Sequence, residues 1–252
     1  MRRKPYIISR QRYIIESSRN LCYNPYKEVI VMAKQKTANT PNIIDAALQY
    51  VEQVFQTDYS GHDYFHTLRV YKTAAAIAEK EKAHLQTVQL AALLHDVDDV
   101  KLSPETYKTK ANARAFLEAN AIGQEEIQKI CQIIDQVSYK GSDSVTPTSL
   151  EGKCVQDADR LDAIGAIGIA RAFAYGGNHN RVMHDPQIEP KLDMNEEEYR
   201  NHISTTINHF HEKLFKLADL MTTPSAKALA RDRQNFMQAY ITQFMDEWDG
   251  RK

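Results

Sequence analysis

Apolar residues recur every three or four positions along most of the chain, beginning near Asn42. In the first such stretch Ile44, Ala47, Leu48 and Val51 would fall on one face of an amphipathic helix. Alternation of apolar and polar residues, which marks strands, is almost absent. We therefore expect an all-α fold. Further helices are expected over residues 64–82, 85–99, 105–119, 124–137, 149–174, 195–220 and 224–247.

The expected helices are separated by segments rich in Gly, Asn, Asp and Pro. Residues 120–123, 140–147 and 176–190 have this composition. It ends helices because Gly and Asn tolerate positive φ and Pro lacks an N–H donor. Pro224 instead stands where a helix is expected to begin, and its missing N–H would be unpaired there in any case.

The first forty residues show no sustained apolar period, and the stretch TANTP at 37–41 is typical of a linker. Residues 1–31 carry seven Lys or Arg against two Glu, but they lack the apolar run of a signal peptide. We predict that residues 1–40 form a basic, poorly ordered extension and that a single domain spans residues 41–250. Because Met32 would make an ordinary start of a cytosolic protein, we also hypothesise that residues 1–31 are dispensable.

Composition is typical of one large domain in a reducing compartment. The chain has 252 residues, of which 42% are hydrophobic and 26% charged, so a sizeable core is possible. The three cysteines form no C-x-x-C pair and are odd in number, which argues against a disulfide framework. Residues 163–174 are too short an apolar stretch to span a membrane. The net charge of -1 gives no electrostatic footprint for nucleic acid. We expect a cytoplasmic protein with neither a membrane nor a nucleic-acid polymer as partner.

The clearest candidate chemistry follows an uninterrupted apolar run. His95 and Asp96 come directly after Leu90 to Leu94, at the end of an expected buried helix. An ionised group emerging from a buried helix needs a counter-charge or a metal, because an unpaired buried carboxylate costs several kcal/mol. The alternative is that the helix simply ends here and that His95 and the acids are solvated.

Three aspartates are set into a mostly apolar helix further along the chain. At about 100° per residue, Asp157 and Asp159 point about 200° apart, whereas Asp159 and Asp162 lie about 60° apart. Only one of Asp157 and Asp159 can therefore face a common centre. Asp157 is expected in solvent or orienting a neighbour, and Asp162 is expected either to orient a metal ligand or to face the substrate.

Five motifs together resemble a known family. They are GHDYFH at 61–66, HD at 95–96, QDADRLDAIGA at 156–166, YGG at 175–177 and HFHEKLFKL at 209–217. The order of the first three resembles the H…HD…D signature of the HD-domain metal-dependent phosphohydrolase superfamily. In particular the chain is similar to a small bacterial subgroup whose members include nucleotide pyrophosphohydrolases. The resemblance covers about residues 43–248 and implies a single HD-domain helical bundle.

The resemblance implies a set of metal ligands, namely His66, His95, Asp96 and Asp159. No histidine lies between Asp96 and Asp159, where relatives with two metals place additional ones, so one divalent cation is expected. Two imidazoles and two carboxylates leave positions open for water and a phosphate oxygen. This donor set suits Mn²⁺, with Mg²⁺, Fe²⁺, Co²⁺ and Zn²⁺ as alternatives.

The resemblance also suggests residues that act on the substrate. An acid three residues beyond the His-Asp pair assists the attacking water in several relatives, and Asp99 occupies that position, although relatives often have the longer Glu there. Lys101, which lies just past the His-Asp helix, is the second catalytic candidate. The candidates for substrate binding are Arg69, His62, Arg160, Arg181 and His184.

The subgroup resemblance favours hydrolysis of nucleoside triphosphates to monophosphate and pyrophosphate. Release of triphosphate, removal of a 5′-phosphate and hydrolysis of a guanosine alarmone stay open, as does a regulatory module that binds nucleotide without turnover. A purely structural helical protein is the third possibility. The expected partner is a small phosphorylated molecule, and a homodimer is possible because helical domains of this type often pair.

Overall fold

The computed structural model describes residues 42–55, 63–100 and 102–252, and this part of the chain contains helices and no strands. The all-α prediction is confirmed. The predicted N-terminal extension and Cys22 lie outside the described residues. The helices are α2 (Ile43–Val54), α3 (Tyr64–Glu81), α4 (Leu85–Leu94), α5 (Ala111–Ala119), α6 (Gln124–Val137), η1 (Gly141–Asp143), α7 (Leu150–Asp162), α8 (Gly165–Asn178), α9 (Glu196–Asn201), α10 (Thr206–His209), η2 (Phe210–Leu214), α11 (Phe215–Leu217) and α12 (Pro224–Trp248).

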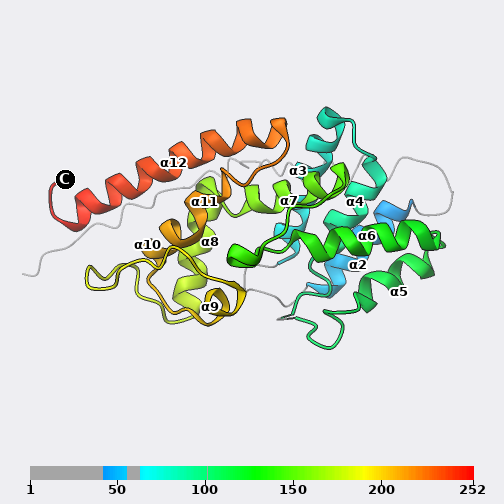
Figure 1. Cartoon of the computed structure of the whole chain (residues 1–252), viewed down its shortest axis with the longest axis horizontal. Helices are drawn as coiled ribbons and strands as arrows, with labels where there is room; N and C mark the ends of the chain where they lie inside the picture. The colour runs from blue at the N-terminus through cyan, green and yellow to red at the C-terminus, as the bar shows by residue number, and fades with distance from the viewer. Residues whose placement is uncertain (1–41, 56–62, 101) are drawn as a thin grey trace, which may run out of the picture. The chain divides into compact units, whose positions relative to one another are not determined.

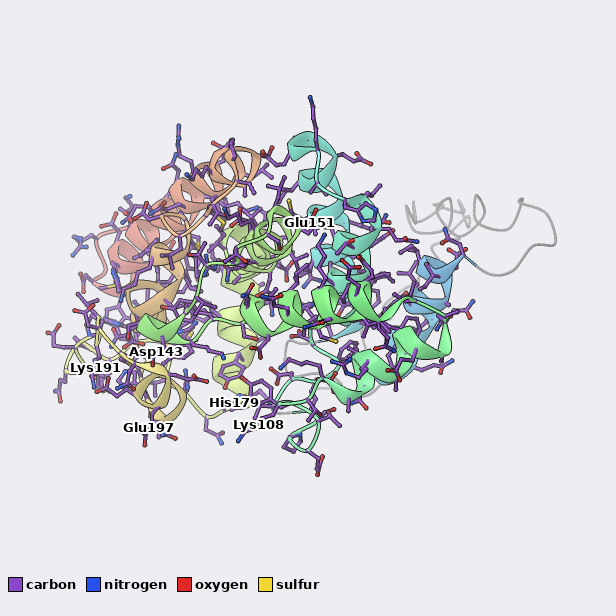
Figure 2. The ribbon with its side chains drawn as sticks, turned by 45° about the vertical axis from the view of Figure 1, so that its right-hand side comes forward. Lys108, Asp143, Glu151, His179, Lys191 and Glu197 are labelled. Carbon is purple, nitrogen blue, oxygen red and sulfur yellow. The ribbon has the colours of Figure 1, made fainter. Side chains whose placement is uncertain are left out.

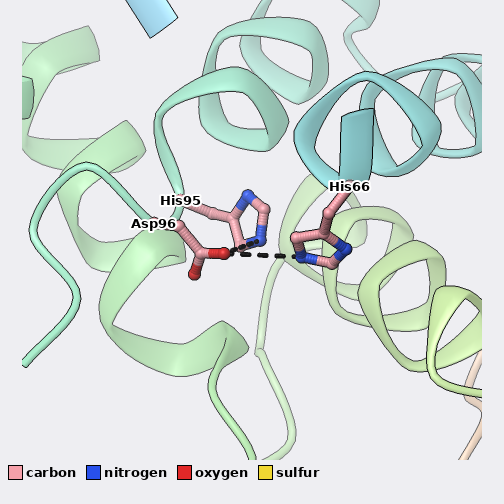
Figure 3. A group of neighbouring side chains, drawn as sticks. All are labelled: His66, His95 and Asp96. Atoms are coloured by element: carbon pink, nitrogen blue, oxygen red, sulfur yellow. Dashed lines mark ion pairs between the residues drawn. The ribbon is translucent and has the colours of Figure 1, made fainter. Parts of the chain in front are cut away.

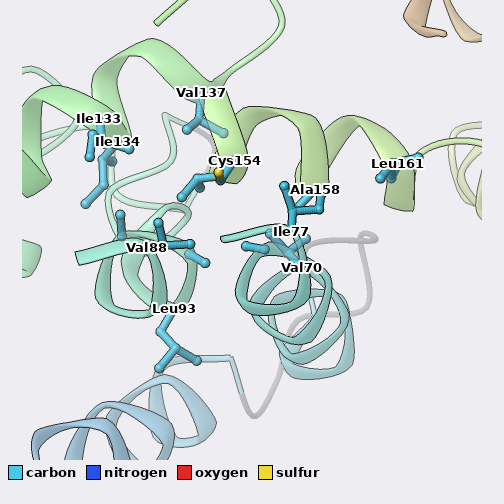
Figure 4. Packing of buried hydrophobic residues seen from close by; sticks show 14 of the residues in the cluster. Val70, Ile77, Val88, Leu93, Ile133, Ile134, Val137, Cys154, Ala158 and Leu161 are labelled. Atoms are coloured by element: carbon cyan, nitrogen blue, oxygen red, sulfur yellow. The ribbon is translucent and has the colours of Figure 1, made fainter. Parts of the chain in front are cut away.

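The helices α3, α4 and α7 form the centre of the bundle. The helix α3 packs against both α4 and α7, and α6 lies against α4 and α7. The helix α2 covers α4, while the long α12 crosses α8, α7 and α3 (Figure 1). Figure 4 shows the apolar side chains between these helices, all of them buried. They include Val70, Ile77, Val88, Leu93, Ile133, Ile134, Val137, Cys154, Ala158 and Leu161.

Side-chain caps fix where the principal helices begin. Asp63 accepts a hydrogen bond from the backbone N–H of His66 at 2.7 Å and so starts α3. Ser149 caps α7 in the same way, and Thr223 caps α12 just ahead of Pro224. Such caps satisfy N–H groups that have no partner inside the helix. The cap of α3 also fixes its first turn, which carries His66.

The single helix predicted over 149–174 is wrong, because the chain turns between α7 and α8. Gly165 lies in the left-handed region with φ +76. A Cβ at this position would lie 2.9 Å from the side chain of Arg233 on α12. A glycine therefore permits both the turn and the close approach of α12.

Two other predicted helices are shorter than their apolar pattern suggested. The helix α4 ends at Leu94, and α5 begins only at Ala111, where the carboxylate of Asp98 accepts from the backbone N–H groups of Asn112 and Ala113. Asp98 thus accepts from N–H groups that have no partner inside α5, and these bonds connect the turns that follow α4 to the start of α5.

The prediction of one continuous helix over 195–220 is also wrong. The structure has α9 there, followed by an extended stretch and then by the run α10, η2 and α11, in which η2 is a π-helical segment. Thr205 caps the second run by accepting from the N–H of Asn208 at 3.0 Å. The first piece is anchored to η1, since Asp143 accepts from the N–H of Glu196 at 2.8 Å, and Figure 2 labels Asp143 near Glu197.

None of the helices described has the length and apolar character that crossing a membrane requires. Cys131 and Cys154 are buried free thiols. Burial raises the pKa of Cys154 to about 12, with Asp157 as the next cause. This cysteine therefore stays a neutral, packed side chain at physiological pH.

Candidate metal centre

Three helices bring the four predicted metal ligands to one point. The first turn of α3 supplies His66, the turn after α4 supplies His95 and Asp96, and α7 supplies Asp159. Nε2 of His66 lies 3.4 Å from Oδ2 of Asp96 and 3.5 Å from Oδ1 of Asp159. Nε2 of His95 lies 3.1 Å and 3.8 Å from the same two oxygens. Figure 3 shows both imidazoles facing Asp96. We call these four side chains the H-H-D-D cluster.

The other ring nitrogen of each histidine is already engaged. Nδ1 of His95 lies 2.8 Å from the carbonyl oxygen of Ala92, so it must donate its proton there. Nδ1 of His66 lies 2.7 Å from Oδ2 of Asp162 and is held in the same way. In the neutral tautomer each Nε2 then presents a lone pair to the centre of the cluster. Histidines that bind metals have this arrangement.

The cluster is suited to a cation by its burial as well as its donors. His66, His95 and Asp96 each offer one ligand atom, and these atoms lie within 4.8 Å of one another. Nε2 of His95 is buried, and its described neighbours in the cluster are carboxylate oxygens, so the lone pair of the neutral ring has no donor there to accept from. A divalent cation would satisfy this nitrogen and offset the two carboxylates, so the residues present fit such an ion.

The electrostatics of the cluster show what happens when no cation is bound. Burial lowers the pKa of His95, but the carboxylates of Asp96 and Asp159 oppose it and raise the pKa to about 9. A proton on His95 therefore balances part of the negative charge at neutral pH. A cation has to displace this proton, which makes metal uptake dependent on pH.

Asp162 orients His66 rather than joining the cluster. It accepts from Nδ1 of His66, from Nε and an amino group of Arg69 at 2.6 and 3.0 Å, and from Arg171 at 2.6 Å. Burial would raise the pKa of Asp162, but hydrogen bonds from His66 and Arg69 and the charge of Arg171 hold it well below its usual range. Of the two roles expected for Asp162, the geometry supports the first.

Asp157 points away from the cluster, as the 200° separation from Asp159 predicts. It is fully buried. Its carboxylate accepts from the backbone N–H and the hydroxyl of Thr222 at 3.0 and 3.1 Å, and from those of Thr223, both at 2.7 Å. Asp157 thus holds the start of α12 against α7. It is neither solvated nor a ligand candidate.

The predicted substrate-binding arginines make contacts within the fold. Arg69 pairs with Asp162, while Arg160 is buried and donates to the carbonyl oxygen of Leu220 at 2.7 Å. This bond links α7 to the turn before α12 and gives Arg160 a structural role. Contact of either arginine with a phosphate stays a prediction.

The remaining predicted residues are spread over several segments. Arg181 lies 5.3 Å from the ring of Tyr175, and His184 packs edge-on against Trp248 at 5.0 Å, so both belong to the packing of the 179–205 segment. Asp99 is half-buried in the turn that follows the His-Asp pair. His62 and Lys101 lie outside the described residues.

Sequence reasoning missed one residue of this network, namely Arg171. It reaches Asp162 from the following helix, α8. The break between α7 and α8 removes the helical spacing that would relate the two residues. The sequence itself therefore carries no signal for this pair.

Comparison with known proteins agrees with this geometry. The model of the HD domain family matches residues 63–164, a range that includes the whole cluster. A solved structure from Lactobacillus plantarum is 42% identical with a TM-score of 0.76, covering 84% of this chain and 100% of that one. An HD-superfamily hydrolase from Bacillus thuringiensis is 41% identical with a TM-score of 0.63, covering 82% and 96%.

YpgQ from Bacillus subtilis is 37% identical over 203 residues, which are 80% of this chain and 91% of YpgQ. A crystal structure of YpgQ in complex with ADP has a TM-score of 0.65 to this chain, covering 81% of this chain and 97% of that one. The similarity therefore extends over nearly the full length of these relatives and is not confined to the short motifs. With its H-H-D-D cluster in place, this chain belongs to the HD-domain superfamily of metal-dependent hydrolases.

Proposed function

We propose that this protein hydrolyses nucleoside triphosphates to the monophosphate and pyrophosphate, with one divalent cation held by His66, His95, Asp96 and Asp159. The observation that carries the proposal is the convergence of these four side chains from separate helices on one point. The nucleotide class is supported by the ADP complex of YpgQ. Mn²⁺ is our first choice because the donors are mixed nitrogen and oxygen.

When bound, the cation would lower the pKa of a water molecule and offset negative charge on a phosphoryl oxygen. The protein's own part is orientation. Asp162 holds the ring of His66 with its Nε2 lone pair directed inward, and the Ala92 carbonyl does the same for His95. Asp99 is our candidate for the group that accepts the proton of the attacking water, and Lys101 our candidate for a nearby cation.

The substrate would approach on the side of Asp159. The side chain of Asp159 is 25% exposed, whereas those of His66, His95 and Asp96 are 1%, 2% and 7% exposed. A phosphate group can therefore reach the cluster past Asp159 more readily than past the other three. The adjoining basic residues, including Arg69 and Arg171, are engaged with Asp162 and would support the site indirectly.

The proposal is tested by assaying the Mn²⁺-loaded protein against a panel of nucleotides, with the products separated by chromatography. We expect equal amounts of monophosphate and pyrophosphate from at least one triphosphate. An Asp96→Ala variant should lose both metal and activity. Orthophosphate from monophosphates, without pyrophosphate from triphosphates, would replace this function by that of a 5′-nucleotidase. Tight nucleotide binding without turnover under any divalent metal would instead favour a regulatory module.

A further inference from the structure

A basic cavity lies between α3 and the start of α12. Its volume is about 220 Å³. The two helices are in contact, and Figure 1 shows the start of α12 passing α3. We call this space the α3–α12 cavity, and its lining includes Lys72, Thr73, Ala76, Lys80, Leu229 and Arg233.

The α3–α12 cavity is separate from the metal cluster. Both use α3, but His66 lies in the first turn of this helix, whereas the cavity begins at Lys72. At a rise of about 1.5 Å per residue, Lys72 lies about 9 Å and Lys80 about 21 Å from His66 along the helix axis. None of the four residues of the H-H-D-D cluster, all of which the structure describes, lines the cavity. The cavity is therefore a second place at which a ligand could bind.

Three cationic side chains meet at this cavity and give it a positive charge. Lys72 and Lys80 approach from α3 and are exposed, whereas Arg233 on α12 is half-buried. Among the described residues that line the cavity, none is acidic. Like charges around a small space repel one another, and an anion between them would replace this repulsion by attraction.

The acids that adjoin these cations in sequence do not line the cavity. They are Glu79, Glu81 and Asp232. Adjacent residues of a helix point about 100° apart, and Glu79 and Asp232 are exposed. Glu81 binds the start of α12, because its Oε1 accepts from the backbone N–H of Ser225 at 2.9 Å. These acids weaken the positive potential of the cavity but do not occupy it.

Arg233 is held in position by the end of α7 and the turn that follows it. Its guanidinium group donates to the backbone carbonyl oxygen of Leu161. Its aliphatic part packs at Gly165, where an added Cβ would lie 2.9 Å from Cγ of Arg233. The bond to Leu161 uses one of the five N–H donors of the guanidinium group, so others can bind a second acceptor. Because the side chain is already fixed, a ligand that binds it loses less free energy to ordering.

We propose that the α3–α12 cavity binds a phosphate-type oxyanion, held by the guanidinium group of Arg233 and the ammonium groups of Lys72 and Lys80. Guanidinium groups match the geometry of phosphate, and charge-assisted hydrogen bonds to phosphate are strong. The volume is below the range of about 300–1,000 Å³ of pockets that enclose drug-sized ligands. The cavity therefore suits a free phosphate ion or the phosphate end of a larger molecule. The site needs no metal and does not depend on the proposed reaction.

The test is the binding of inorganic phosphate to the full chain, measured by calorimetry at constant ionic strength. It is run on the Mn²⁺-loaded wild type and on Asp96→Ala, because phosphate could also bind at the metal of the wild type. We expect binding to persist in Asp96→Ala. In that background Lys80→Gln should weaken binding about threefold, since Lys80 is exposed and water screens its contact. The matched control is Lys227→Gln, which removes an exposed lysine of α12 outside the cavity lining and should leave binding unchanged.

A second variant fills the cavity without changing its charge. Ala76→Leu adds a larger side chain at an exposed position of α3, and both residues favour helix, so the fold should be kept. By blocking a charge-assisted contact with the anion, it should weaken phosphate binding about tenfold. Its matched control is Ala228→Leu, at an exposed alanine of α12 outside the cavity lining, which should bind phosphate as its parent does.

Several results would overturn the proposal. Loss of phosphate binding in Asp96→Ala would place the anion at the metal centre. Unchanged affinity in either Lys80→Gln or Ala76→Leu, or losses equal to those of the two controls, would show that the cavity is not the site. Absence of phosphate binding by both parent proteins would overturn the proposal as well.

Titration with AMP distinguishes the two sources of the oxyanion. Binding no tighter than that of phosphate would indicate the free ion, whereas tighter binding that Ala76→Leu abolishes would indicate the phosphate end of a nucleotide. These outcomes are separate from those of the nucleotide panel. Phosphate binding in Asp96→Ala that Lys80→Gln and Ala76→Leu weaken would support the cavity even if the wild type hydrolyses no nucleotide.

Discussion

Replacing Asp162 by Asn should separate orientation of a metal ligand from metal binding itself. In the wild type, four side-chain hydrogen bonds from His66, Arg69 and Arg171 end on this carboxylate. An amide has one acceptor oxygen and one NH₂ group, so it cannot accept all of them. If the NH₂ group faces His66, Nδ1 must give up its proton, and Nε2 then carries a proton that points into the cluster.

The expected size of the effect follows from these contacts. Loss of a partner that orients a metal-bound histidine typically costs about 10- to 100-fold in metal affinity. Removing one partner of a fully buried ion pair costs about 3–5 kcal/mol, but Arg69 and Arg171 are 35% and 25% exposed and water recovers part of this. We therefore expect Asp162→Asn to weaken Mn²⁺ binding at least tenfold and to lower the free energy of unfolding by about 2 kcal/mol.

The assay is a calorimetric titration with Mn²⁺, accompanied by chemical denaturation of the metal-free protein. Asp157→Asn is the matched control, because Asp157 is an equally buried aspartate on the same helix that bonds Thr222 and Thr223 instead of a metal ligand. It should be destabilised without a change in the Mn²⁺ affinity of the folded protein. Wild-type affinity in Asp162→Asn, or equal losses of affinity in both variants, would refute the reasoning.

Three further predictions concern the proton on His95, the candidate base and the turn after α7. In the metal-free protein, protonated His95 contributes stability that is fully present below about pH 6.5 and is lost as the pH rises through about 9, so denaturation midpoints should fall over that window. Mn²⁺ uptake at pH 7.5 should release about one proton, which calorimetry in two buffers measures, and no release would contradict this prediction. Asp99→Asn should lower kcat about 100-fold with Mn²⁺ affinity unchanged, and a wild-type rate in this variant would exclude Asp99 as the base. The neighbouring control, Asp98→Asn, should cost about 1 kcal/mol of stability because it weakens the start of α5. Gly165→Ala should cost about 1–2 kcal/mol because of its positive φ, with an unchanged denaturation midpoint as the contrary result.

The features predicted correctly from the sequence are those fixed by local spacing. His95 and Asp96 are adjacent at the end of an apolar run, so their joint position depends on one helix end. The angles among the α7 aspartates follow from about 100° per residue, and they explain why Asp157 and Asp159 face different partners. Bringing α3, α4 and α7 together, by contrast, was inferred from the family resemblance and not from the spacing.

The features that were missed depend on departures from regular helix. Gly165 was visible in the sequence, but its φ of +76 and the proximity of Arg233 arise from the packing of α12. The π-helical segment η2 has no sequence signal, because its apolar pattern is that of a continuous helix. Arg160 adjoins Asp159 in the sequence, but adjacent residues of a helix point about 100° apart, and the bond of Arg160 to Leu220 depends on the packing of α7 against the turn before α12. Contact of Arg160 with a phosphate stays a prediction.

One helix therefore carries three aspartates with separate tasks, and this bears on how the site is kept in place. Asp157 secures the start of α12, Asp159 faces the cluster, and Asp162 fixes His66 through the Nδ1 contact. Because Asp157 and Asp162 flank Asp159 on the same rigid element, each fixes the position of α7 against a different neighbour. Loss of either contact removes stability, but only the loss of Asp162 also frees the ring of a ligand histidine. Metal affinity should accordingly respond to the identity of the lost contact more than to the loss of stability.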